Sequence, residues 1–147
     1  MVQKIHRIAA VTAFLCVVTF FASTLSVEVC GSEESIILVK SLVVFPGLFI
    51  LVPCIATAGA TGVALSKAKE GRVIESKKKR MPFIAFNGIF VLVPAAIFLN
   101  YKAVEGVFDT AFIVVQVAEL VVGALNGYLM FLNIRDGRKL TGKKRAN

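Results

Sequence analysis

The chain has 147 residues, of which 57% are apolar and only 18% are charged, and its formal net charge is +8. A soluble domain of this length would need far more polar surface to cover its core. The apolar residues form four long blocks rather than recurring at amphipathic spacing, which predicts an integral membrane protein. We therefore expect an all-α fold: a four-helix transmembrane bundle in which residues 1–147 form a single domain.

The first predicted helix covers residues 8–27 and contains no charge. Lys4 and Arg7 before it could be the n-region of a signal peptide. A retained helix is favoured, because the block is longer than a typical signal-peptide core and no A-x-A cleavage site follows. His6 and Arg7 are expected to bind lipid headgroups at its edge. Alternatively, they could hold a haem b or a quinone.

The second predicted helix, residues 36–65, is longer than a bilayer requires. At 1.5 Å per residue it would span about 45 Å, against a hydrocarbon core of about 30 Å. It must therefore tilt, bend, or begin in the interface with Lys40 extended toward water. Pro46 and Pro53 each remove a backbone donor, which predicts kinks. Small residues dominate after Pro53 and would let another helix approach closely.

The third predicted helix, residues 83–99, carries the polar Asn87 near its cytoplasmic end and a kink-forming Pro94. Its stretch FNGIFVLVP, residues 86–94, matches FPGLFILVP, residues 45–53, at six of nine positions. The two stretches run in opposite directions across the bilayer, as an inverted repeat would. Common ancestry, a shared kink geometry and chance are all open as explanations.

A polar stripe marks the fourth predicted helix, residues 110–134. Its members recur at intervals of 3, 4, 3, 4 and 3, and so share one helix face. They are Gln116, Glu119, Gly123, Asn126, Met130 and Asn133. Turning amide and carboxyl groups toward lipid would cost a few kcal/mol each, so the stripe should face the bundle interior or a subunit interface. Asn87 is expected to meet Asn133 at a similar depth.

Glu119 lies near the middle of this helix, where an ionisable residue is a functional candidate by default. Burial could keep it protonated, as a donor that joins helices together with Gln116 and Asn126. Alternatively, a cation from a substrate or a partner subunit could hold it ionised. The candidate intramembrane polar or ligand-binding site therefore consists of Glu119, Gln116, Asn126, Asn133 and Asn87.

Positive charge is concentrated in three segments. Seven Lys and Arg residues lie in the loop 66–81, six in the tail 135–147 and two before the first helix, whereas only Lys40 and Lys102 remain for the other side. The positive-inside rule then puts both termini and the middle loop in the cytoplasm. We interpret the basic segments as contacts with anionic lipid and expect no nucleic-acid binding. A bacterial inner membrane is the expected location.

No catalytic constellation is present in the sequence, which lacks a Ser-His-Asp set, a metal-ligand spacing and a phosphate-binding glycine loop. We therefore expect no enzymatic activity, metal or cofactor. The leading hypothesis is an accessory subunit of a membrane complex, or a bundle that self-associates into a homo-oligomer. One alternative is small-ligand binding or transport at Glu119, and another is a redox subunit with haem or quinone near His6 and Arg7.

Overall fold

The computed structural model of the chain describes residues 1–67 and 72–143, and this described part contains only helices and short turns. Four helical rods are each long and apolar enough to cross a membrane, as predicted. The elements are α1 (Val2–Cys30), α2 (Glu33–Leu42), the π-helical η1 (Val43–Leu48), α3 (Phe49–Lys67), α4 (Arg72–Phe86), the π-helical η2 (Asn87–Leu92), α5 (Val93–Val104) and α6 (Thr110–Lys143). The second rod joins α2, η1 and α3, and the third joins α4, η2 and α5.

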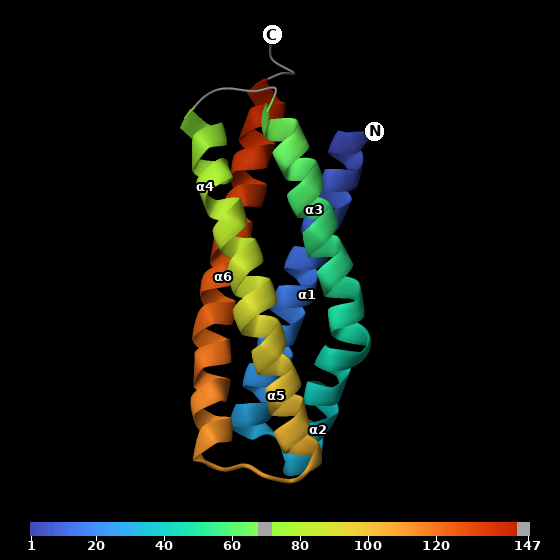
Figure 1. Cartoon of the computed structure of the whole chain (residues 1–147), viewed down its shortest axis with the longest axis vertical. Helices are drawn as coiled ribbons and strands as arrows, with labels where there is room; N and C mark the ends of the chain where they lie inside the picture. The colour runs from blue at the N-terminus through green and yellow to red at the C-terminus, as the bar shows by residue number, and fades with distance from the viewer. Residues whose placement is uncertain (68–71, 144–147) are drawn as a thin grey trace.

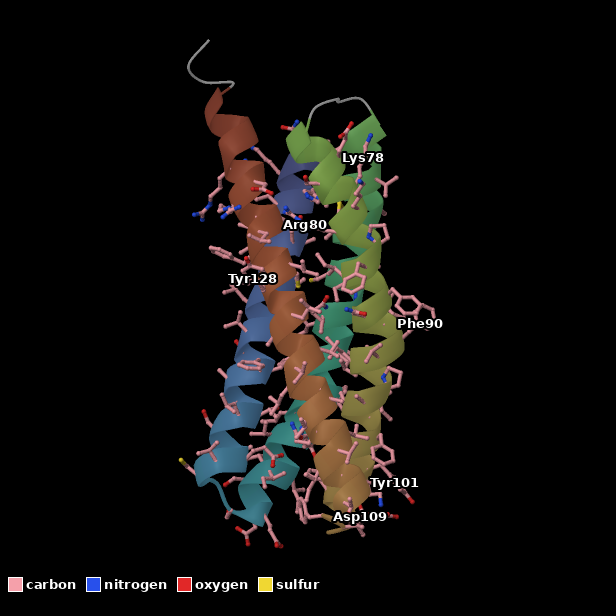
Figure 2. All side chains as sticks on the ribbon, turned by 90° about the vertical axis from the view of Figure 1, so that its left-hand side faces the viewer. Lys78, Arg80, Phe90, Tyr101, Asp109 and Tyr128 are labelled. Carbon is pink, nitrogen blue, oxygen red and sulfur yellow. The ribbon has the colours of Figure 1, made fainter. Side chains whose placement is uncertain are left out.

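The four rods run up and down beside one another (Figure 1). The turn from α1 to α2 and the connection from α5 to α6 lie at one end of the bundle, and the start of α1 lies at the other. The most extensive contact joins α1 to α3, and α6 packs against α1, α4, α5 and η2. Lys78 and Arg80 lie near one end, whereas Tyr101 and Asp109 lie near the other (Figure 2).

The helices extend beyond the predicted apolar blocks. The third rod begins at Arg72 and ends at Val104, against a prediction of residues 83–99, and α6 continues to Lys143 instead of ending near residue 134. Much of the predicted loop 66–81 and tail 135–147 is therefore helical. Lys, Arg and Glu are strong helix formers, so a helix need not end where it leaves the lipid. Hydropathy identified only the most apolar part of each helix.

The backbone departs from α-helical geometry near the prolines of the second and third rods. Phe45 has φ −136° and ψ 116°, outside the helical region, and it precedes Pro46. The proline ring disfavours a helical conformation in the preceding residue, which accounts for the break. Pro53 lies inside α3. In the third rod the π-helical η2 comes directly before the turn that contains Pro94.

The two similar stretches turn equivalent residues toward the interior and toward the outside of the bundle. Gly47 and Gly88 are both buried in the bundle. The phenylalanines of each stretch point outward and are paired ring to ring, with centroids 5.3 Å apart in one pair and 5.1 Å in the other. The pairs are Phe45 with Phe49, and Phe86 with Phe90, the last of which projects from the bundle in Figure 2. Common ancestry of the two stretches stays a prediction.

Gly47 and Gly59 form a matched pair for testing how closely the helices pack. A methyl group added at Gly47 would lie 2.6 Å from Phe20 Cζ and 2.9 Å from the Leu42 carbonyl oxygen, whereas one at Gly59 would meet nothing within 4 Å. We expect Gly47→Ala to lower the free energy of unfolding by about 1–3 kcal/mol. Gly59→Ala should leave it unchanged or raise it by up to about 1 kcal/mol. Unfolding in detergent micelles measures both, and equal effects would contradict this packing.

Asp109 caps the start of α6. Its Oδ1 accepts a hydrogen bond from the backbone N–H of Phe112 at 2.9 Å, and its Oδ2 accepts one from Lys102 Nζ at 2.6 Å. The hydrogen bond from Lys102, followed by the bond from the Phe112 amide, lowers the pKa of Asp109 below its ordinary value. The side chain thus joins the end of α5 to the beginning of α6.

The lowered pKa of Asp109 makes stability depend on pH in a defined direction. The free energy of unfolding that ionised Asp109 contributes is fully present above the ordinary carboxyl pKa, about 3.9. It is lost as the pH falls through the lower pKa of the folded state. We expect Asp109→Asn to flatten the loss of thermal stability below about pH 4. Midpoints of thermal unfolding measured in detergent across this range test it. A variant with the same acid dependence as the parent protein would contradict the assignment.

Candidate functional site

The polar stripe of α6 faces the interior of its own bundle. Asn126 is 0% exposed, and Gln116 and Met130 are also buried. Several of the stripe's buried polar atoms have no hydrogen-bond partner: both amide atoms of Asn126, Oε1 of Gln116 and Oδ1 of Asn133. Such atoms cost free energy in an apolar interior. Their concentration on this face of α6 makes it the candidate functional site.

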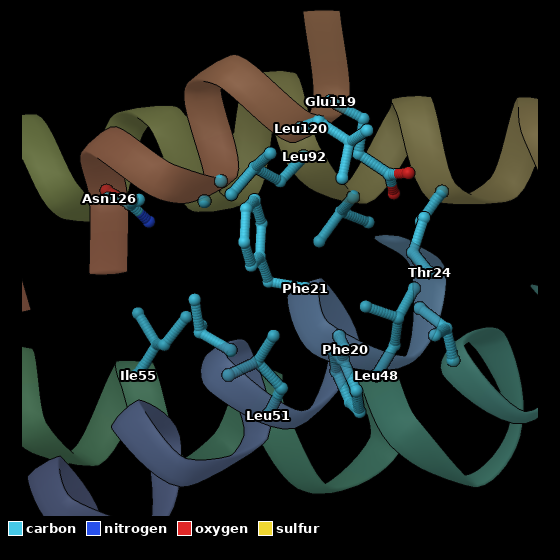
Figure 3. A pocket seen from close by; sticks show the side chains of 16 residues that line it. Phe20, Phe21, Thr24, Leu48, Leu51, Ile55, Leu92, Glu119, Leu120 and Asn126 are labelled. Carbon is cyan, nitrogen blue, oxygen red and sulfur yellow. The ribbon is translucent and has the colours of Figure 1, made fainter. Parts of the chain in front are cut away.

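A cavity of about 60 Å³ lies beside this stripe, with Glu119 and Asn126 in its wall (Figure 3). Most of its lining is apolar, and Phe21 stands between the two polar residues in the close-up. Leu51 and Leu92 occupy matching positions in the two similar stretches, and both line the cavity. The second and third rods therefore provide equivalent parts of one wall.

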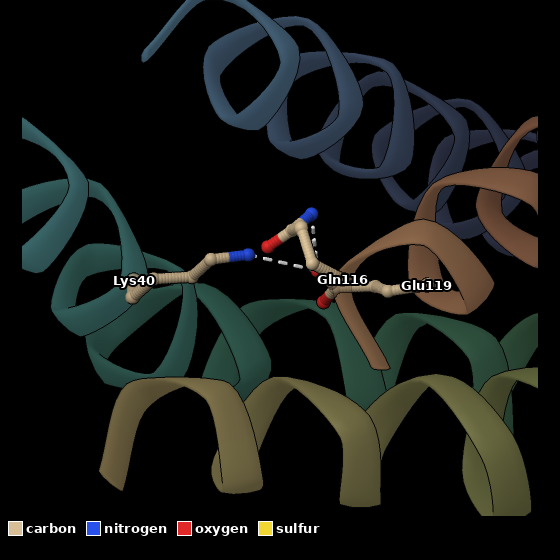
Figure 4. Close-up of polar contacts among 3 residues, drawn as sticks. All are labelled: Lys40, Gln116 and Glu119. Carbon is tan, nitrogen blue, oxygen red and sulfur yellow. Dashed lines mark hydrogen bonds and ion pairs between the residues drawn. The ribbon is translucent and has the colours of Figure 1, made fainter. Parts of the chain in front are cut away.

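A buried ion pair lies at the Glu119 end of the cavity. Lys40 Nζ of α2 donates to Glu119 Oε2 at 2.9 Å (Figure 4), and the side chains are 1% and 15% exposed. Gln116 Nε2 also approaches Oε2, at 3.5 Å. Both contacts end on Oε2, which leaves Oε1 as the acceptor that a molecule in the cavity could reach.

Lys40 does not extend toward water, as one sequence-based alternative had it. The ammonium group turns inward because a carboxylate on the opposite rod is close enough to pair with it. A cation of the same chain therefore faces Glu119.

Glu28 near the end of α1 adds a second carboxylate to this region. It lies within electrostatic range of both Lys40 and Glu119. Its Oε1 is buried and has no hydrogen-bond partner. Two carboxylates and one ammonium leave this cluster with a formal charge of −1 when all three groups are ionised. Neither Glu28 nor Lys40 was among the predicted site residues.

Asn87 is buried, but no hydrogen bond joins it to Asn133, whose Oδ1 has no partner. Two contacts fix the register of the third rod against α6. Arg80 Nη1 lies 2.8 Å from Asp136 Oδ2, and Gly88 lies beside the Asn126 side chain. Because the helices are antiparallel, Asn87 lies nearer the level of Asn126 than that of Asn133.

His6 lies between α1 and α3 and does not line the cavity. Its Nδ1 lies 3.1 Å from both the Ala58 carbonyl oxygen and Thr61 Oγ1, so the ring ties the two helices together. Arg7 is exposed. The haem or quinone alternative for His6 and Arg7 stays a prediction.

A signal for the ion pair was present in the sequence. Lys40 and Glu119 each stand alone in an otherwise apolar segment, and intramembrane charges usually pair. Lys40 is seven residues after Glu33 at the start of α2, about 10 Å along the axis, and Glu119 is about 14 Å beyond Thr110. Both helices start from the same end, so a lysine stem can bridge the difference in depth.

Comparison of the chain with protein-family models, with curated proteins and with solved structures found no match.

The ion pair predicts a large difference between single and double substitutions. Lys40→Met leaves the Glu119 carboxylate buried without its cation and should cost about 3–5 kcal/mol of unfolding free energy. Lys40→Met combined with Glu119→Leu should recover most of this, since well-packed apolar pairs often replace buried ion pairs without loss. Unfolding in mixed micelles measures both variants.

Lys102→Met is the matched control, because it breaks an ion pair at the surface and should change stability little. Equal losses in the Lys40→Met variant and the double variant would contradict the coupling of Lys40 and Glu119.

Proposed function

We propose that the chain is a small membrane-spanning protein that binds or transports a small ligand in the cavity between Glu119 and Asn126. The observation that carries this proposal is the buried Lys40–Glu119 ion pair, which borders an interior cavity. Ionisable residues inside a membrane are expensive and commonly mark a path or site for ions and substrates. The contacts from Lys40 and Gln116 both end on Oε2, so Oε1 of Glu119 is the atom available to a ligand.

Joining the helices of the bundle does not by itself explain why these residues are polar. Apolar side chains of similar volume usually stabilise an interior as well as a buried ion pair does. Asn126 has both amide atoms buried without partners, which costs a few kcal/mol and contributes nothing to joining helices. A ligand that accepts from Nδ2 and donates to Oδ1 would remove that cost.

We also propose an orientation of the chain in the membrane. We place both termini, the end of α3 and the start of α4 on the cytoplasmic side of a bacterial inner membrane. The clustering of basic residues near that end of the bundle supports this orientation, as does the acidic character of the opposite end. We further propose that bends near Pro46, Pro53 and Pro94 shape the second and third rods around the cavity, because freed carbonyls and bent helices commonly border such spaces.

A second candidate function is an accessory or self-associating subunit, as the sequence suggested. One observation favours it: Ala56 and Ala60 are exposed on α3, and a methyl group at Gly59 between them would meet nothing within 4 Å. Such a surface lets another transmembrane helix approach closely. Gly123 and Gly127 of α6, by contrast, already face Phe21 and Val17 of the same chain.

Binding of methylammonium tests the primary function. This cation is small and donates hydrogen bonds, so it should raise the thermal midpoint of the full chain in detergent by binding at Glu119 Oε1. Glu119→Gln should remove the effect. Glu33→Gln, which changes an exposed carboxylate at the same end of the bundle, should keep it, and tetramethylammonium should be too large to act.

No methylammonium effect, together with no movement of any cation that depends on Glu119 in vesicles, would contradict binding or transport at this site. Mass spectrometry from mild detergent tests the second candidate. A Gly59→Leu variant that stays as associated as the parent protein would contradict association through α3.

A further inference from the structure

The size of the cavity restricts what can occupy it. A site for a drug-sized molecule holds about 300–1,000 Å³, and even benzene fills an engineered cavity of about 150 Å³. The cavity beside α6 is about 60 Å³. A buried water needs about 10–15 Å³, so a few water molecules or one very small ion fit and drug-sized substrates do not.

A few polar groups in the mostly apolar wall can bind water. Asn126 is fully buried, and its amide presents one donor and one acceptor without partners. Thr24, which is buried, and Glu119 line the same space. Unpartnered buried polar groups in roomy polar sites are commonly satisfied by ordered water, with two to four hydrogen bonds per molecule.

Polar groups continue along α6 beyond the cavity. From Gln116 to Asp136 the helix rises about 30 Å, the thickness of the hydrocarbon core. Asn133 and the Arg80–Asp136 pair continue the column toward the end that we propose to be cytoplasmic. Apolar groups interrupt the column at two places: the Phe21 ring stands between Glu119 and Asn126 (Figure 3), and Met130 packs with Leu51 and Ile84 between Asn126 and Asn133.

The charge cluster can hold one additional proton. Glu28 from α1, Lys40 from α2 and Glu119 from α6 carry a formal charge of −1 together, which is costly in a low-dielectric interior. Lys102 of α5, a cation at the same end of the bundle, is already paired with Asp109 near the surface. One proton added to a carboxylate makes the cluster neutral, while Lys40 stays charged.

We propose, building on the function proposed above, that the ligand of this site is the proton, carried by ordered water in the cavity. Glu119 takes a proton from a hydronium ion of the cavity, leaving water and a neutral carboxyl group, and later returns it to a neighbouring water. Asn126 holds the water chain in place. Met130 and its apolar neighbours form a barrier that must open or admit water for the proton to pass.

Proton flux into vesicles tests the proposal. The full chain is reconstituted in phosphatidylethanolamine–phosphatidylglycerol vesicles with a trapped pH-sensitive dye, and valinomycin with a potassium gradient supplies the driving force. We expect the internal pH to change faster than in protein-free vesicles. Glu119→Gln should slow this change at least tenfold, whereas Glu33→Gln should match the parent protein.

Two further variants separate conduction from folding. Asn126→Leu removes the groups that hold the water and should also slow the flux, with helix content checked by circular dichroism. Met130→Ala opens the barrier and should increase the flux severalfold, a gain that damage to the fold would not produce in an otherwise sealed vesicle. This gain should disappear when Met130→Ala is combined with Glu119→Gln.

Two results would overturn the proposal. One is a flux equal to that of protein-free vesicles in both the parent protein and Met130→Ala. The other is a flux that Glu119→Gln leaves unchanged. If methylammonium still binds through Glu119 in either case, only the choice of the proton fails. If methylammonium binding is absent as well, the proposed function of the cavity fails with it.

Discussion

The Lys40–Glu119 ion pair is the interaction on which the interior of the bundle depends. It joins the second and fourth rods at 2.9 Å, with Gln116 and Glu28 as polar neighbours. Neither residue is tolerable there without the other, since a single buried charge costs several kcal/mol. The pair therefore constrains how α2 and α6 are placed, and through them the cavity that Glu119 borders.

The helices could be predicted from the sequence because each one needs a long apolar segment to cross the bilayer. Their ends could not, since Lys- and Arg-rich segments continue the helix into water and leave no hydropathy signal, as at Arg72 and Lys143. The inward stripe of α6 followed from its spacing. The isolated charges of Lys40 and Glu119 and their similar depth were a signal for their pairing, but contact also depends on the relative rotation of the two rods, which only packing determines.

The two similar stretches contribute shape rather than chemistry. Each turns a glycine inward and its phenylalanines outward, and each contributes the leucine at its seventh position, Leu51 or Leu92, to the cavity wall. The buried glycines allow close approach, which is clearest where Gly47 meets the Phe20 ring. The polar side chains of the candidate site come from α6 and from single residues of α1 and α2. This division explains why the repeated segments, the most visible pattern in the sequence, contain almost no polar side chains.

The position of the ion pair along the chain has a consequence for biogenesis. Lys40 belongs to the second rod and Glu119 to the last, so a chain that enters the bilayer from its N-terminus delivers the lysine well before its partner. A lysine at the centre of an isolated helix costs about 2.5–3.5 kcal/mol on insertion scales, less near the interface. Lys40 lies close to the start of α2, so its ammonium group can stay at the level of the lipid headgroups until α6 inserts. Arrival of the last helix would then draw the lysine inward and complete the assembly.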